Sequence, residues 1–134
     1  MAIKFDTEHV RIVGIFERLT GVYVKDCIVD DKCVYFLIDP NQMGLVIGKN
    51  GENIRNIKNL LGKDVKVFEY GDTAEKVIRN MIKNVKDIEI NNGVITITIP
   101  PNEKSVVIGK NGRNIKIIKK FLQRHFHIKK LRLK

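Results

Sequence analysis

Two short loops, Gly48-Lys49-Asn50-Gly51 and Gly109-Lys110-Asn111-Gly112, hold the residues of this chain that are best suited to chemistry. Each loop has a glycine at both ends, so no Cβ atom hinders the approach of another backbone there. Apolar residues at helical spacing follow the second glycine and predict a helix whose N–H groups and positive dipole end face the loop. The lysine adds positive charge, and the asparagine can donate a hydrogen bond or adopt a left-handed turn. Each loop is therefore predicted to hold a phosphate group.

The two loops belong to an internal duplication. Segments 46–61 and 107–122 lie 61 residues apart and are identical at 11 of 16 positions. A helix corner that uses glycine for geometry alone would explain one copy, but it explains a second copy with the same lysine and asparagine much less well. The repeat predicts two domains, residues 1–70 and 71–134, of roughly 65 residues each. Because domains of this size are marginally stable alone, we expect the halves to pack against each other.

Each half is predicted to be an α+β unit with the order helix, strand, strand, helix, glycine loop, helix, strand. Asp6 or Thr7 is a candidate N-cap of the first helix, and Asp72 and Glu75 have capping-box spacing in the second half. Asn91-Asn92-Gly93 supplies residues that tolerate positive φ in a hairpin. The expected strands are 22–29, 33–38 and 65–68, then 86–90, 94–99 and 126–133. Helices are expected at 7–19, at 41–47 and 102–108, and after each glycine loop.

The net charge of +10 is concentrated in the second half. Residues 1–70 hold 10 Lys/Arg and 10 Asp/Glu, whereas residues 71–134 hold 15 and 5. From Lys104 onward there are eleven basic residues and no acidic one. Such a one-sided distribution favours a polyanionic partner, because each neutralised phosphate releases condensed counterions.

The sequence Ile-Gly-x-x-Gly between two helices resembles the signature of the K-homology (KH) domain. The order of elements is similar to the type II arrangement, in which the extra helix precedes the sheet. Two tandem units of this kind resemble the archaeal NusA-like transcription factors, and the resemblance runs from about Thr7 to the C-terminus. It implies that the chain binds single-stranded RNA, clamping the backbone of about four nucleotides in each loop and receiving the bases in an aliphatic groove.

Carried over residue by residue, the resemblance assigns RNA-binding roles to both loops and to their neighbours. Ile47 and Ile108, directly before the loops, would border the aliphatic groove. Basic residues on the helices that follow would track the sugar-phosphate chain, with a solvated face as the alternative. These aligned pairs are Arg55 with Lys116 and Lys58 with Lys119.

The first helical position after the loop differs between the copies, with Glu52 in one and Arg113 in the other. A carboxylate at this position competes with a phosphate for the helix dipole. We therefore predict that the first clamp is the weaker one and count Arg113 among the RNA-binding residues. The chain has no Trp and few aromatic residues, which argues against a base-stacking platform.

No catalytic residues, cofactor or metal site are predicted. The loops lack the spacing of a Walker motif, and no nucleophile and base are placed together. His9, His125 and His127 have no Cys or carboxylate at a spacing that would complete a metal site. Cys27 and Cys33 would lie on facing strands of one hairpin, and we interpret them as reduced, buried residues. No apolar run approaches the roughly 20 residues needed to cross a membrane, so we expect a cytoplasmic protein. We also expect it to be a monomer.

Single-stranded RNA is the expected partner, and the resemblance adds RNA polymerase as a second one. A NusA-like role in transcription elongation, termination or antitermination is the favoured function. A KH-type RNA-binding protein in ribosome assembly or ribosomal-RNA processing remains the alternative, because both use the same clamp. Binding of single-stranded DNA is also left open by the sequence.

Overall fold

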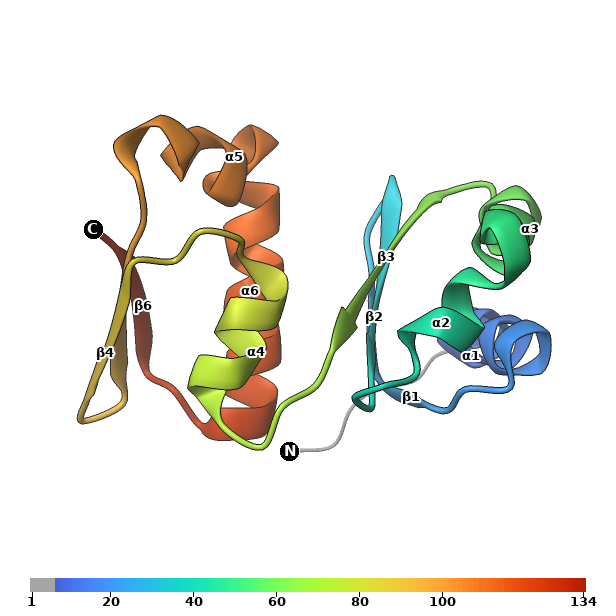
Figure 1. Ribbon diagram of the computed structural model, residues 1–134, viewed down its shortest axis with the longest axis horizontal. Coiled ribbons are helices and arrows are strands. Elements are labelled where there is room, and N and C mark those ends of the chain that lie inside the picture. The colour runs from blue at the N-terminus through green and yellow to red at the C-terminus, as the bar shows by residue number, and fades with distance from the viewer. Residues whose placement is uncertain (1–6) are drawn as a thin grey trace. The chain divides into compact units, whose positions relative to one another are not determined.

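The computed structural model describes residues 7–134, and Figure 1 shows its helices and strands. The chain divides into two compact units, residues 1–70 and 71–134. Each unit contains a three-stranded mixed sheet together with its own helices. The predicted α+β class and the repeated order of elements are confirmed. The packing of the two units against each other stays a prediction.

The first unit begins with α1 (Thr7–Thr20), β1 (Val24–Val29) and β2 (Cys33–Ile38). It continues with α2 (Met43–Ile47), the 3₁₀ turn η1 (Lys49–Gly51), α3 (Glu52–Leu61) and β3 (Asp64–Glu69). The central strand β2 is antiparallel to β1 and parallel to β3. The amphipathic helix α1 buries Phe16, whose ring stacks on Phe36 of β2 with 4.1 Å between the ring centroids. Gly21 ends this helix with a φ of 72°, as the sequence indicates.

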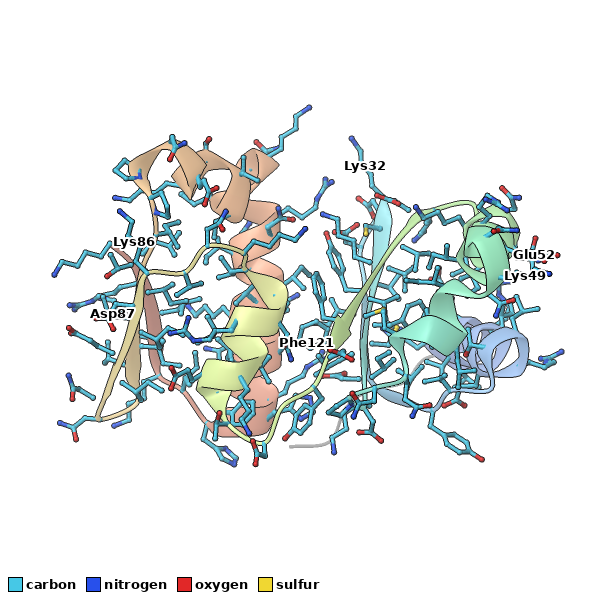
Figure 2. The ribbon with its side chains drawn as sticks, in the orientation of Figure 1. Lys32, Lys49, Glu52, Lys86, Asp87 and Phe121 are labelled. Carbon is cyan, nitrogen blue, oxygen red and sulfur yellow. The ribbon has the colours of Figure 1, made fainter. Side chains whose placement is uncertain are left out.

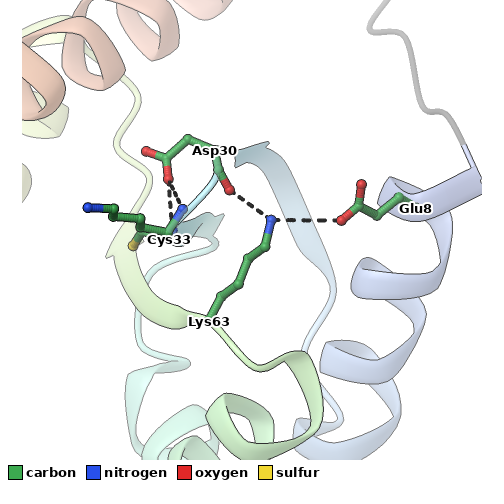
Figure 3. A network of polar contacts seen from close by, with 5 residues as sticks. Glu8, Asp30, Cys33 and Lys63 are labelled. Carbon is green, nitrogen blue, oxygen red and sulfur yellow. Dashed lines mark hydrogen bonds and ion pairs between the residues drawn. The ribbon is translucent and has the colours of Figure 1, made fainter.

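A polar network around Lys63 joins three parts of the first unit (Figure 3). Lys63 Nζ donates to the backbone oxygen of Asp30 at 2.8 Å and lies 3.8 Å from Glu8 Oε1. The carboxylate of Asp30 accepts from the backbone N–H of Cys33 at 2.7 Å, which fixes the turn between β1 and β2. The loop after α3 is therefore tied both to the hairpin turn and to α1.

The second unit repeats the plan with α4 (Ala74–Met81), β4 (Asp87–Asn91) and β5 (Val94–Thr98). The 3₁₀ turn η2 (Pro101–Glu103), α5 (Lys104–Ile108), the 3₁₀ turn η3 (Lys110–Gly112), α6 (Arg113–Phe126) and β6 (Lys130–Leu133) follow. β5 is central, antiparallel to β4 and parallel to β6. Asn92 and Gly93 both have positive φ, 51° and 80°, as expected for a two-residue hairpin loop.

The last strand of the second unit begins later than the sequence predicts. Phe126, expected as its first residue, is instead the last residue of α6, and β6 begins at Lys130. Gly62 caps α3 in a left-handed conformation, whereas α6 runs to Phe126 and is capped by His127 at φ 53°. Cys33 pairs with Asp64, and its counterpart Val94 pairs with Lys130. The second unit therefore has five more residues between its glycine loop and its last strand.

The start of α4 also differs from the prediction. The N-cap is Thr73, whose hydroxyl oxygen accepts from the backbone N–H of Lys76 at 3.2 Å. Asp72, expected as the cap, instead forms an ion pair with the Lys76 side chain at 2.8 Å. The hydrogen bond from the Lys76 side chain, together with its positive charge, lowers the pKa of the Asp72 carboxyl group. The capping-box spacing suggested the wrong residue because Asp72 and Thr73 are adjacent and both can cap a helix. Asp6, the other candidate cap, lies outside the described residues.

Candidate nucleic-acid interface

The two glycine loops have nearly the same backbone conformation. In the first loop, Gly48, Asn50 and Gly51 have φ values of 73°, 55° and 72°. The corresponding values in the second loop are 77° for Gly109, 58° for Asn111 and 71° for Gly112. Three of the four residues in each loop thus lie at positive φ, where glycine and asparagine are best tolerated. The pattern Gly-Lys-Asn-Gly is therefore matched to this conformation position by position.

The two glycines of each loop serve different purposes. A Cβ atom on Gly48 would lie 2.7 Å from Asn53 Cγ, and one on Gly109 would lie 2.9 Å from Asn114 Cγ. The first glycine therefore makes room for a side chain of the same chain. A Cβ atom on Gly51 would have no neighbour closer than 3.6 Å, and one on Gly112 none closer than 4.0 Å. The second glycine leaves a bare, open surface.

Asn53 and Asn114 fasten the loops to the helices that precede them. Asn53 Nδ2 donates to the backbone oxygen of Leu45 at 2.9 Å, and Asn114 Nδ2 donates to that of Val106 at 3.1 Å. These oxygens belong to the last turns of α2 and α5, where carbonyl groups lack helical partners. Neither asparagine is among the residues that the sequence pattern predicts to bind RNA. The sequence signal that could have identified them is that both copies of the repeat have asparagine at this position.

The loops lie at the N-termini of α3 and α6. Gly51 and Gly112 are the N-cap residues, so no side chain of the cap residue occupies the positive end of either helix. Lys49 is exposed, and it lies next to Glu52 at the start of α3 (Figure 2). In the second unit Lys110 is exposed and Arg113 occupies the position of Glu52. The field at the second loop is therefore more favourable for an anion.

The basic residues of α3 and α6 differ in their surroundings. Arg55 Nη1 lies 3.6 Å from the place of a Cβ atom on Gly51, and Lys116 Cε lies 4.0 Å from that on Gly112. Both side chains thus border the second glycine of their loop. Lys58 Nζ forms an ion pair with Asp64 Oδ1 at 3.3 Å. Lys119 has no such pair within residues 7–134.

Exposed aliphatic side chains precede each loop. Leu45 and Ile47 of α2 are 55% and 44% exposed, and Val106 and Ile108 of α5 are 71% and 38% exposed. Val46, between the first two, is fully buried and anchors α2 in the core. Exposed aliphatic residues in a row beside an open loop are suited to contact the faces of bases. Ile47 and Ile108 are the last residues of α2 and α5, directly before the loops.

The other candidate residues form no site of their own. Cys27 and Cys33 are buried and are not joined by a disulfide, as interpreted from the sequence. Burial raises the pKa of the Cys33 thiol. Within residues 7–134, no group of three or more His, Cys, Asp or Glu residues could hold a metal ion, and no helix is long and apolar enough to cross a membrane.

Each unit thus places a Gly-x-x-Gly loop between two helices beside a sheet of mixed direction, with one further helix before the sheet. That arrangement defines the KH domain in its type II form. The KH domain model matches residues 12–83, and the model of the NusA-like second KH domain matches residues 74–133.

Proteins from archaea are similar over nearly the whole chain. The probable transcription termination protein NusA of Methanocaldococcus jannaschii is 31% identical over 98% of this chain and 75% of its own length. That of Halobacterium salinarum is 30% identical over 99% of both chains. The crystal structure of APE1850 has 29% identity and a TM-score of 0.77, covering 97% of this chain and 100% of its own. The chain belongs to the archaeal NusA-like family of RNA-binding, tandem KH-domain proteins.

Proposed function

We propose that each glycine loop clamps the backbone of single-stranded RNA, and that the exposed aliphatic residues before it receive the bases. The observation that carries this proposal is the repetition of one loop conformation in both units. Positive φ at three positions, a bare second glycine and the open N-terminus of a long helix occur together twice. KH domains hold about four nucleotides in this way.

The second clamp is the stronger of the two. Glu52 places a negative charge at the start of α3, and Asp64 engages Lys58 in an ion pair. Arg113 replaces Glu52 in the second unit, and Lys130 pairs with β5 where Asp64 pairs with β2. Both differences favour phosphate binding in the second unit.

The two clamps act on one RNA strand. β3 ends at Glu69 and α4 begins at Ala74, so only residues 70–73 connect the two units. Once one clamp is occupied, a short connection keeps the other at an effective concentration on the order of mM. Two weak contacts then add up to a useful affinity.

A role in transcription termination or elongation accounts best for such a protein. Relatives that match this chain over 75% and 99% of their own length carry the name probable transcription termination protein NusA. We propose that this chain binds the nascent transcript and works with RNA polymerase. Crosslinking of RNA inside cells, with sequencing of the bound fragments, tests this role. Enrichment of nascent transcripts and co-purification of polymerase subunits are expected, whereas enrichment of ribosomal RNA and ribosomal particles would contradict it.

Charge reversal in the loops tests the clamps themselves. Lys110→Asp with Asn111→Asp should abolish most binding of a single-stranded oligoribonucleotide, with the circular dichroism spectrum and melting temperature nearly unchanged. The same pair of changes at Lys49 and Asn50 is the matched control and should cost less affinity. An equal or larger loss in the first loop would refute the ranking of the clamps. Loss of the fold in either variant would favour a purely structural role.

A further inference from the structure

The sheet of the second unit has one face that its own helices leave open. Helices α4 and α6 lie on one side of the sheet (Figure 1), and Ile95 and Ile97 of β5 are fully buried. The residues between and beside them point to the other side and are partly exposed. We call this other side the open sheet face. Its residues on β5, β6 and the following position are Val94, Thr96, Thr98, Lys130, Arg132 and Lys134.

The same face of the first sheet has a different character, although the strand pairing is equivalent. The pair Tyr35 and Lys66 corresponds to Thr96 and Arg132. Cys33, Tyr35 and Leu37 of β2 are all buried. The central strand of the first copy is thus buried on this face, whereas the second copy carries partly exposed threonines on its central strand and exposed cations beside them. The difference belongs to the second unit and does not follow from the shared fold.

The positive charges of the open sheet face are regularly spaced and exposed. Lys130, Arg132 and Lys134 alternate with Leu131 and Leu133, so they share one side of β6 and its extension, about 6.6 Å apart. This spacing lets each cation meet a separate phosphate. Within residues 7–134, none of the three forms an ion pair.

Acidic residues lie on the open sheet face at the edge opposite β6. Asp87 and Glu89 belong to β4, where they pair with Thr98 and Thr96 of β5. They are therefore two strand spacings from β6, about 9.6 Å. Lys86, next to Asp87 at the start of β4 (Figure 2), is also exposed. The face thus has a cationic edge along β6 and a mixed edge along β4.

The open sheet face is connected to the glycine loop of the same unit. β5 and β6 are parallel, so their C-terminal ends lie at the same edge of the sheet. Beyond that end, β5 continues through η2 and α5 into Gly109. Lys134 extends the ladder at the same edge, where its N–H donates to Ile97 O at 2.8 Å. An RNA strand that leaves the glycine loop at this edge of the sheet can continue along the cations of β6 and Lys134.

We infer that the open sheet face binds the phosphate backbone of nucleotides that flank those held by the second glycine loop. The inference rests on the proposed function, since it extends the RNA path of that clamp. Phosphate contacts position a nucleic acid without reading its sequence. The face therefore adds affinity and length to the site but no base preference.

Removal of the three cations tests the inference in the whole chain. The variant carries Lys130→Gln, Arg132→Gln and Lys134→Gln. Its matched control changes three exposed cations that belong to neither clamp nor to the open sheet face, Arg11→Gln, Lys32→Gln and Lys83→Gln. Binding of oligouridylates and oligoadenylates of about four and about twelve nucleotides is measured by fluorescence anisotropy at several salt concentrations.

The longer RNAs should bind the open-face variant up to about 100-fold more weakly than the control at 0.1 M salt. The slope of log affinity against log salt concentration should fall in magnitude by about 2, because each of the three phosphate contacts on a single strand contributes about 0.7. The shorter RNAs should bind it as they bind the control. Equal affinity and slope of the two variants for the longer RNAs would overturn the inference and leave an acidic protein as the candidate partner. Failure of the unaltered chain to bind any of these RNAs would instead refute the proposed function.

Discussion

Replacement of Asn114 by alanine should loosen the second glycine loop without unfolding its domain. The side chain does two things in the structure. Its Nδ2 donates to Val106 O at 3.1 Å, and its Cγ fills the space that a Cβ atom on Gly109 would need. With the side chain gone, the end of α5 is no longer tied to the start of α6. The loop then has to be ordered by the RNA rather than in advance.

The size of the effect follows from the hydrogen bond. A neutral bond of this kind contributes about 0.5–1.5 kcal/mol net, and its exposed position places it near 1 kcal/mol. If the RNA must restore the loop geometry, the same free energy weakens binding roughly fivefold. The melting temperature should fall by about 4–8 °C per kcal/mol lost in a domain of this size. Fluorescence anisotropy with a short oligoribonucleotide measures the affinity, and hydrogen exchange measures the protection of the loop amides.

Two further variants separate positioning from bulk stability. Asn114→Asp keeps the shape of the side chain but replaces the donating Nδ2 with a carboxylate oxygen, which cannot donate to Val106 O. Its negative charge favours the helix dipole by about 0.3–1 kcal/mol but repels phosphate, so affinity should fall more than stability. Asn53→Ala removes the equivalent bond in the first loop and should lower stability similarly with a smaller loss of affinity. An RNA affinity of Asn114→Ala within twofold of the unaltered chain, with the loop amides still protected, would refute the positioning role.

Three other predictions concern single features of the structure. Glu52→Arg should tighten RNA binding at low salt, because the negative charge at the start of α3 is reversed; unchanged affinity in a titration would count against the anion site at that helix. Thr73→Ala should lower the stability of the second unit by about 1 kcal/mol through loss of the N-cap, which urea denaturation would detect; a loss on Asp72→Ala alone would point back to the other cap. Burial raises the pKa values of Tyr35 and of Cys33, the latter above its ordinary 9.0, so both groups ionise more readily when unfolded. The melting temperature should therefore fall as pH rises above about 9, and Tyr35→Phe should reduce that dependence, whereas a flat profile between pH 8 and 11 would contradict it.

Much of the fold could be predicted because its signals are local. The exact repeat of Gly-Lys-Asn-Gly identified both loops, and their conformations agree within a few degrees because glycine and asparagine tolerate positive φ. The strand 33–38 was predicted at its observed bounds, since its apolar run is continuous and buried on both faces. The end of α1 also followed from a single residue, Gly21.

The errors occurred where two local signals compete. Phe126 was assigned to the last strand, yet helix α6 runs to that residue. The first unit has Gly62 to stop the helix, and the second has Gln123 at the aligned position. Without a stop signal, the end of the helix is set by where the chain must turn to pair with β5.

The sequence by itself determined the duplication, the order of elements and the residues of both loops, because each of these depends on neighbours within a few positions. Tertiary structure alone decided which distant groups meet. The fastening of each loop by Asn53 or Asn114, the pairing of Lys58 with Asp64 and the placement of Lys130, Arg132 and Lys134 on an open face all depend on strand register and helix packing. A shift of one residue in that register would turn the cations towards the core and the leucines towards solvent.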